Sequence, residues 1–437
     1  MSGIEIGLLA IALMLAAIYF GLHIAVALIA VSFVSVTLLK SSALATRMVG
    51  AAANDSIQEY LFGVVPLFVL MGMLVSVSGV GRDMFDVFQW LLRRVRGGLG
   101  VATVAANAVF AAITGISIAS ASVFTKVAVP EMLRHGYTPS FSVGVVAGSS
   151  VLGMLIPPSL LMIIYGVLAE ESVGRMFMAG VIPGLFLALA FSVMIVAMAI
   201  FTPKWIGGRP AGDLAGLETL GSAARKLAPT VALIVLVLGG LYGGLFTPTE
   251  AGAVGAAGAL VIALARRSLD RRRFWRVLLE TGQVSVAVLF LILAATLYSR
   301  MLALTGLPSS IAEQFTAWGL GPYGFLFVYI VLLILLGCII DSVSIMLIVL
   351  PIVLPIAKAF GMDLIWFGVI TVVAVEVGLI TPPFGISAYT VKAALNDPGI
   401  SIRQIFAGSV PFVLCMCLVL AVLVAFPGMS TWLARMP

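Results

Sequence analysis

The chain has 437 residues, of which 62% are hydrophobic and only 10% are charged. Soluble domains carry about 25% charged residues, so no soluble fold would cover this much apolar surface. The apolar runs are continuous rather than alternating, which excludes a transmembrane barrel. The net charge of +6 is typical of cytoplasmic loops in a membrane protein and does not indicate nucleic acid as a partner. We therefore predict an all-α polytopic protein that lies in a lipid bilayer.

Apolar runs long enough to span a bilayer occur in both halves of the chain. The first half, residues 1–225, is predicted to contain, in chain order, scaffold spans within 4–78, an arm at 82–96, a re-entrant helical hairpin at 98–134, a broken helix at 139–170 and a span at 180–202. The second half, residues 226–437, is predicted to contain spans within 227–304, a re-entrant helical hairpin at 321–357, a broken helix at 363–395 and a span at 409–427.

The interruptions of these runs come in matched pairs. The two Pro-Pro pairs begin at Pro157 and Pro382, 225 residues apart, and the same offset relates Gly153 to Gly378. The arm at 82–96 carries four arginines, whereas its counterpart in the second half carries no cation. Equivalent segments with opposite charge bias belong on opposite sides of a membrane. The sequence therefore predicts two repeats that are inverted relative to each other.

Arginine-rich amphipathic sequence occurs at 82–96 and again at 268–280. Both segments fit lateral arms that lie along the cytoplasmic interface. Ordinary cytoplasmic loops of a positive-inside protein are the alternative for each.

Inverted repeats with discontinuous helices are typical of secondary transporters. Proline has no N–H, so each Pro-Pro pair leaves the carbonyls four residues earlier without their helical donors. Such carbonyls are too costly in hydrocarbon unless a partner satisfies them, and a dehydrated cation does so. At each hairpin tip, hydroxyls suit a cation, and the N-terminus of the second half-helix suits an anion. We therefore predict two pseudo-symmetric Na+ sites beside an anionic substrate.

The candidate site residues lie at the hairpin tips and the helix breaks. The first Na+ site is predicted to use Gly115, Ser117, Gly153, Ile156 and Pro157. The second Na+ site is predicted to use Asp341, Ser342, Ser344, Gly378, Thr381 and Pro382. The substrate is expected to contact Ser117, Ser159, Ser342 and Ser387. Helix capping is the alternative role for Ser159 and Ser387.

Four charged residues lie inside apolar segments, and one of them has two competing interpretations. Asp341 fits either a cation ligand or the N-cap of the second half-helix of its hairpin. Glu376 is expected to fix its broken helix through hydrogen bonds, and Lys126 and Arg300 are expected to be snorkelling or interfacial cations.

The two histidines lie far apart and the three cysteines lie in apolar runs. No catalytic residues and no cofactor are therefore expected. The only bound ion expected is Na+, as the coupling ion.

The chain resembles the large membrane subunit of TRAP transporters, a DctM-type permease. The matching stretches are GMLIPPSLLMIIYGVLAEESVGRMFMAGVIPG at 153–184, IIDSVSIMLIVLPIVLPI at 339–356 and GMDLIWFGVITVVAVEVGLITPPFG at 361–385. The resemblance implies a multi-pass protein of the bacterial inner membrane with the elevator fold of the ion-transporter superfamily, coupled to Na+. It also implies two partners: a small, DctQ-like membrane subunit of about four spans and a periplasmic, DctP-like substrate-binding protein.

Two departures from the family pattern concern the substrate. Many members have an Asp shortly after the first hairpin tip, where this chain has none, and an Asn often stands where this chain has Ser387. A C4-dicarboxylate is therefore not assumed. We expect an importer of a small organic anion, a carboxylate.

Three alternatives follow from the same sequence. A stand-alone Na+/carboxylate symporter of the same fold would work without a binding protein. An intramembrane enzyme would need a nucleophile and a base, or clustered metal ligands, at membrane depth, and the chain offers neither. A passive channel is disfavoured because the predicted hairpins do not span the membrane.

Overall fold

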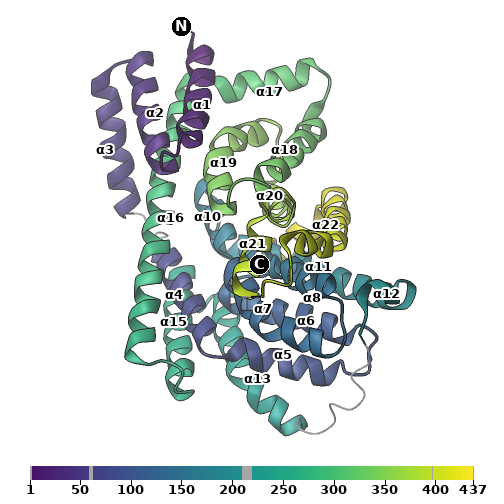
Figure 1. Cartoon of the computed structure of the whole chain (residues 1–437). Coiled ribbons are helices and arrows are strands. Elements are labelled where there is room, and N and C mark those ends of the chain that lie inside the picture. The colour runs from purple at the N-terminus through teal and green to yellow at the C-terminus, as the bar shows by residue number, and fades with distance from the viewer. Residues whose placement is uncertain (1, 59–62, 209–218, 396, 437) are drawn as a thin grey trace.

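The computed structural model describes residues 2–58, 63–208, 219–395 and 397–436, and within these ranges every regular element is a helix (Figure 1). Seven of the described helices are long and apolar enough to cross a membrane, or nine if each of two bent helix pairs forms one span. The predicted all-α polytopic class is confirmed. Residues 59–62 of the predicted scaffold and residues 209–218 near the end of the first repeat lie outside the described residues. The repeat boundaries stay a prediction.

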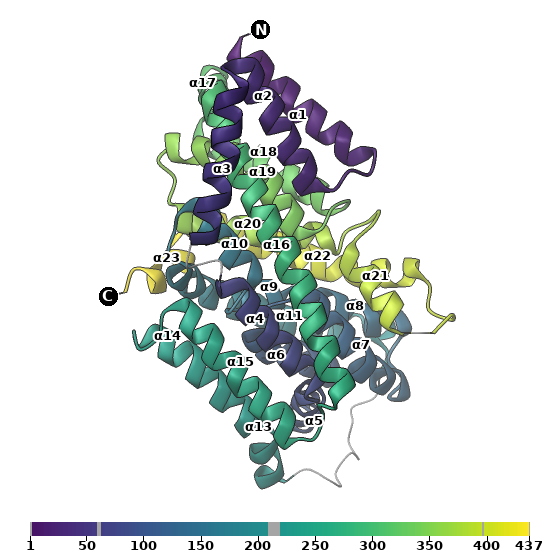
Figure 2. The same cartoon turned by 90° about the vertical axis from the view of Figure 1, so that its left-hand side faces the viewer.

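The predicted scaffold region forms helices on both sides of one long helix. The helices are α1 (Gly3–Tyr19), α2 (Ile24–Leu39), α3 (Ser42–Gln58), α4 (Val64–Val77), α13 (Leu220–Ile234), α15 (Pro248–Ala265) and α16 (Arg271–Thr305). The long helix α16 packs against α1, α2 and α3 toward one end and against α4 toward the other, as both views show (Figure 2). A π-helix, η2 (Val235–Gly239), and α14 (Gly240–Tyr242) extend α13.

One of the two expected lateral arms, at 268–280, is instead the start of the long helix α16. Asp270 is the N-cap of α16, and its Oδ1 accepts a hydrogen bond of 2.7 Å from the backbone N–H of Arg273. The same bond lowers the pKa of Asp270. Residues from Arg271 onward continue without a break into the span, so 268–280 is not a separate lateral arm. Within the expected arm at 82–96, the residues up to Leu91 belong to a separate helix, α5 (Val80–Leu91), which bends by 63° from α4. Its role as a lateral arm stays a prediction.

The remaining helices divide between the two halves of the chain. In the first half they are α6 (Gly98–Thr114), α7 (Ser117–Arg134), α8 (Pro139–Ser150), α9 (Leu152–Leu155), α10 (Leu160–Ala169) and α11 (Val173–Phe201). In the second half they are α17 (Leu307–Ala317), α18 (Gly321–Gly337), α19 (Ser342–Ala359), α20 (Leu364–Leu379), α21 (Ile386–Leu395) and α22 (Ile402–Ala425). Two short helices, α12 (Pro203–Ile206) and α23 (Gly428–Ala434), complete the chain.

Contacts between the halves build one packed core around the breaks. The backbones of α8 and α22 meet at Gly144 and Gly408, where a Cβ on either residue would collide with the other helix. The Tyr165 hydroxyl donates to the carbonyl of Leu364 at 2.6 Å. Since glycine contacts and buried hydrogen bonds both require close approach, the broken helices of the two halves are held together directly.

Candidate functional site

The first hairpin tip lies directly on the break of its own repeat. Helix α6 ends at Gly115, whose φ of +62° is the left-handed conformation that glycine adopts without strain, and α7 begins at Ser117. The carbonyl of Gly115 accepts a hydrogen bond of 3.2 Å from the N–H of Leu160, just beyond the break. A Cβ on Gly153 would lie 3.2 Å from the Cα of Ser117. The structure therefore brings the predicted ligands of the first Na+ site together.

The break itself is short and fully buried. Helix α9 ends before Ile156, whose backbone is extended, and the Pro157-Pro158 bond that follows is cis. The hydroxyl of Ser159 donates to the carbonyl of Met154 and accepts from a backbone N–H at the start of α10, at 3.3 Å. Ser159 is thus an N-cap that satisfies one of the two carbonyls freed by the prolines. The carbonyl of Gly153 is the other, and the substrate contact of Ser159 stays a prediction.

The second hairpin tip also contacts its own break. Helix α18 ends at Gly337, and a Cβ there would lie 2.7 Å from the Cα of Gly378. The N–H of Phe384 donates to the carbonyl of Cys338 at 3.0 Å. Asp341 is the N-cap of α19, with its Oδ1 accepting from the N–H of Ser344 at 3.0 Å. Because a capping carboxylate keeps its charge and a second oxygen, capping does not remove Asp341 from the candidate ligands.

The second break differs from the first in its exposure. The carbonyl of Gly378 accepts a hydrogen bond from the N–H of Thr381 at 2.9 Å, and the Thr381 hydroxyl donates to the carbonyl of Val377 at 2.6 Å. Pro382 and Phe384 are exposed, whereas every residue from 151 to 160 is buried. The second break is therefore partly exposed and the first is enclosed, although Ser342, Ser344 and Gly378 of the candidate second site are themselves buried.

The four serines predicted to contact substrate lie at the N-terminal ends of four half-helices. Ser117 and Ser342 are the first residues of α7 and α19. Ser159 caps α10, and Ser387 lies in the first turn of α21. Helix α7 packs against α21 and α10 packs against α19, so each hairpin adjoins the broken helix of the other repeat. Helix N-termini carry partial positive charge, which suits a carboxylate.

Two of these serines have unused hydroxyls. Ser117 and Ser387 are both 0% exposed, and neither Oγ has a hydrogen-bond partner within the described parts of the chain. Nearly all buried polar groups in folded proteins have a partner. The two hydroxyls are therefore available to a ligand, and their assignments to Na+ and substrate stay predictions.

Glu376 contradicts its expected role. Its side chain lies in α20 and is 1% exposed, and neither carboxyl oxygen has a hydrogen-bond partner among the described residues. The expectation that Glu376 fixes the broken helix through hydrogen bonds is therefore wrong.

Arg300, expected as an interfacial cation, makes an ion pair of 2.7 Å with Asp55 of α3.

A buried polar group that was not predicted from the sequence lies next to the first hairpin tip. Asn107 of α6 contacts Ser120 of α7 and Ser149 of α8 through side-chain hydrogen bonds. The available signal was an asparagine inside the apolar run 98–134. In the part of the chain that the structure describes, no three His, Cys, Asp or Glu side chains are grouped to hold a metal ion.

The fold and the paired breaks define a polytopic helical membrane protein with the fold of a solved transporter. The YdaH transporter of Alcanivorax borkumensis superposes with a TM-score of 0.55 at 15% identity, over 84% of this chain and 86% of that one. Residues 11–429 match the family model of the tripartite ATP-independent periplasmic transporter, DctM component. The chain therefore belongs to the DctM family of TRAP transporter large permeases.

Curated relatives agree with this family. The C4-dicarboxylate TRAP transporter large permease protein DctM of Pseudomonas aeruginosa is 35% identical over 398 residues, 91% of each chain. The protein of the same name from Rhodobacter capsulatus is 34% identical over 86% of this chain and 87% of its own. The sialic acid TRAP transporter permease protein SiaT of Haemophilus influenzae is 30% identical over 92% of this chain and 64% of its own. The resemblance seen in the sequence is confirmed: the chain is a multi-pass transport permease of the bacterial inner membrane and not an enzyme.

Proposed function

We propose that this permease imports a small organic anion, a carboxylate, coupled to a Na+ gradient, within a tripartite transporter. The observation that carries the proposal is the contact of each hairpin tip with the break of its own repeat, at Gly153 against Ser117 and at Gly337 against Gly378. The first contact places main-chain carbonyls beside the buried, unpartnered hydroxyl of Ser117, and the second brings the tip that leads to Ser342 and Ser344 onto the carbonyls of its break. Carbonyls and hydroxyls together are the ligand chemistry of a dehydrated Na+. Na+ bound at both places would also add positive charge beside the four half-helix N-termini.

An elevator mechanism fits the division of the helices. The scaffold would comprise α1–α4, α13, α15 and α16, and the carrier would comprise both hairpins and both broken helices. The two broken helices of the carrier are tied to each other by the hydrogen bond from the Tyr165 hydroxyl to the carbonyl of Leu364, and α22 packs on the first of them where Gly408 meets Gly144. A body held together in this way can move past the scaffold as one unit.

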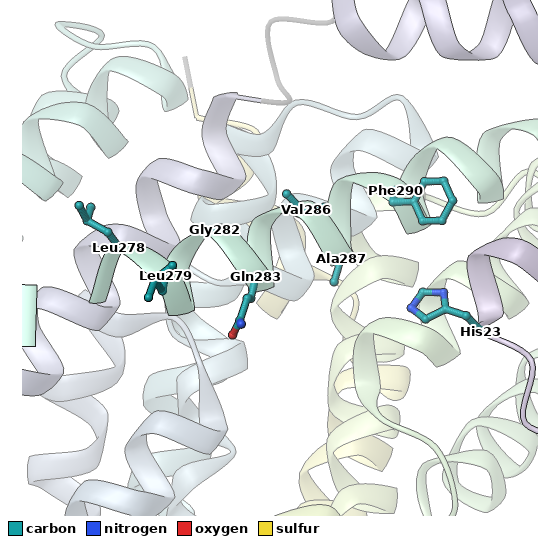
Figure 3. A pocket seen from close by; sticks show the side chains of 8 residues that line it. All are labelled: His23, Leu278, Leu279, Gly282, Gln283, Val286, Ala287 and Phe290. Atoms are coloured by element: carbon teal, nitrogen blue, oxygen red, sulfur yellow. The ribbon is translucent and has the colours of Figure 1, made fainter. Parts of the chain in front are cut away.

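The small membrane subunit is proposed to pack on the outer face of α16. A shallow cavity of about 630 Å³ lies there, lined by α16 residues between Leu278 and Phe290 and by His23. Figure 3 shows Gln283 on α16 and the His23 ring facing Phe290. Gly282 and Gln283 are exposed, although they lie in a membrane-spanning helix. A small residue beside a polar one is typical of contacts between transmembrane helices, so a helix of the partner is the expected occupant.

The partners are tested by purification from mild detergent. The full chain, isolated from its native membranes, should bring down a small membrane subunit in about equal amount, identified by mass spectrometry. Replacing Gly282 with Leu should release that subunit, whereas Gly50→Leu on α3, also with open space around it, should not. A chain that comes out alone and still drives Na+-dependent uptake would favour the stand-alone symporter instead.

The substrate class is tested with the binding protein. The relatives are named for different substrates, which include C4-dicarboxylate, sialic acid and ectoine. The ligand that co-purifies with the partner binding protein should be a carboxylate, and proteoliposomes should accumulate it only when Na+ is supplied outside. Equal uptake in Na+-free buffer under other gradients would refute the Na+ coupling.

A further inference from the structure

The first hairpin contains a buried hydrogen-bonded group that ties both of its arms to the broken helix. The Asn107 side chain on α6 accepts a hydrogen bond from the Ser120 hydroxyl on α7 and donates one of 2.6 Å to the Ser149 hydroxyl on α8. The Ser149 hydroxyl in turn donates to the carbonyl of Val145 at 2.6 Å. Asn107 and Ser149 are 0% exposed and Ser120 is 1% exposed. This group, the Asn107 clamp, joins three helices inside an apolar core.

The clamp lies next to the candidate first Na+ site. Ser120 belongs to the first turn of α7, which Ser117 begins. Ser149 lies about one helical turn before Gly153, and a Cβ on Gly153 would be 3.2 Å from the Cα of Ser117. The two sides of the site are therefore fixed to each other through Asn107, one turn away from the Na+ ligands.

We propose that Asn107 is a positioning residue of the first Na+ site, which holds Ser117 at the spacing from Gly153 that Na+ requires. The inference rests on the Na+ coupling proposed above. It adds that the two Na+ sites are unequal: the first is held in place by the buried side chains of the clamp, and the second lacks a side-chain clamp of this kind. A site whose ligands are already held in place loses less freedom on binding and binds more tightly.

The second repeat has no equivalent of the clamp. The residues 225 positions after Asn107, Ser120 and Ser149 are Leu332, Ile345 and Ala374, and their side chains cannot hydrogen-bond. Its buried polar link between hairpin and broken helix is instead the bond of 2.8 Å between the hydroxyls of Tyr329 and Thr371. That bond lies about two turns or more before the tip and the break. The second break is also exposed, as described above.

The chain itself supplies the substitutions for the test. Asn107→Leu and Ser149→Ala place in the first repeat the side chains that stand at the matching positions of the second. Tyr329→Phe is the matched control, because it removes one buried hydrogen bond between a hairpin and its broken helix but touches neither Na+ site. The full-length protein, purified with whatever subunit accompanies it, is melted in detergent at increasing NaCl, with choline chloride holding the ionic strength constant.

The half-saturating Na+ concentration for thermal stabilisation is the readout, because it reports binding separately from the melting temperature without Na+. Asn107→Leu should raise it about tenfold, the effect of losing a buried hydrogen bond that supports binding. Ser149→Ala should also raise the half-saturating Na+ concentration, which keeps the test valid if Asn107→Leu does not fold. Tyr329→Phe should lower the melting temperature and leave the half-saturating Na+ concentration unchanged.

Two results would overturn the positioning role of Asn107 and leave the proposed Na+ coupling standing. One is a wild-type Na+ response in folded Asn107→Leu and Ser149→Ala variants. The other is an equal rise in the half-saturating Na+ concentration for Tyr329→Phe, which would mean that any loosening of the core weakens Na+ binding. A wild-type protein that Na+ does not stabilise at all would overturn the Na+ coupling itself, and the two failures are therefore distinguishable.

Discussion

Gly337 and Gly378 meet backbone to backbone where the first arm of the second hairpin crosses its broken helix. A Cβ on Gly337 would lie 2.7 Å from the Cα of Gly378 and 2.9 Å from the carbonyl oxygen of Val375. Real Cβ atoms do not approach backbone atoms so closely, so any other residue at 337 must push α18 away from α20. The contact keeps the second tip on the second break, and the candidate second Na+ site depends on it.

Replacing Gly337 with Ala should therefore damage both stability and Na+ binding. Forcing a methyl group into a packed contact costs about 1–3 kcal/mol, and the displaced tip should raise the half-saturating Na+ concentration. Thermal melting with and without Na+ measures both effects. Gly50→Ala on α3, where nothing lies within 4 Å, should leave both unchanged. A Gly337→Ala variant that melts like wild type would show that the helices can separate without cost.

Ser117 should prove to be a ligand rather than a packing residue. Its Oγ is buried without a partner among the described residues, so Ser117→Ala removes no hydrogen bond within the protein. We expect little change in the melting temperature without Na+ and about a tenfold rise in the half-saturating Na+ concentration. Ser32→Ala on α2, also buried with an unpartnered hydroxyl, is the control and should leave Na+ binding intact. Equal behaviour of the two variants would contradict the assignment.

Asp341 can be separated into its two candidate roles by two substitutions. Asp341→Asn keeps the oxygen that caps α19 but removes the negative charge, whereas Asp341→Ala removes both. If Asp341 also binds Na+, both variants should weaken Na+ binding and only Asp341→Ala should lose about 1 kcal/mol of stability. Asp270→Asn, at the capping position of α16, should change neither. Normal Na+ binding by Asp341→Asn would reduce Asp341 to a helix cap.

The helix breaks could be predicted from the sequence because local chemistry sets them. Proline removes donors wherever it stands, and the 225-residue offset places the starts of α7 and α19 at Ser117 and Ser342, as observed. The isolation of Glu376 and the bond from Ser159 to Met154 could not be predicted, because they depend on which segments pack together in space. The same holds for the Asn107 clamp, which joins residues from three helices.

Two features of the scaffold also depend on contacts in space. Helix α3 carries Arg47, Asn54 and Asp55 and does not have the length and apolarity of a membrane span. Its pairing of Asp55 with Arg300 links positions far apart in sequence. The continuous helix from Arg271 also could not be distinguished from an arm, because arginines cluster at its start as they do in the segment 82–96.

The arm α5 should be anchored to the scaffold by one ion pair in particular. Asp83 on α5 and Arg266 at the end of α15 lie 2.5 Å apart, and each side chain is 23% exposed. A double-mutant cycle with Asp83→Asn and Arg266→Gln should give a coupling energy of about 1 kcal/mol. The pair between Arg134 and Glu131, in which Arg134 is 77% exposed, should give almost none. Absence of coupling at Asp83 would mean that solvent already screens the pair.

Na+-driven uptake through the assembled transporter tests together the proposed Na+ coupling and the need for a binding protein. Proteoliposomes would contain the chain with its co-purified membrane subunit, and the binding protein would be added outside with its radiolabelled ligand. We predict uptake that needs both the binding protein and an inward Na+ gradient, and that stops when a K+ gradient replaces the Na+ gradient. Equal uptake under the K+ gradient, or without the binding protein, would contradict this prediction.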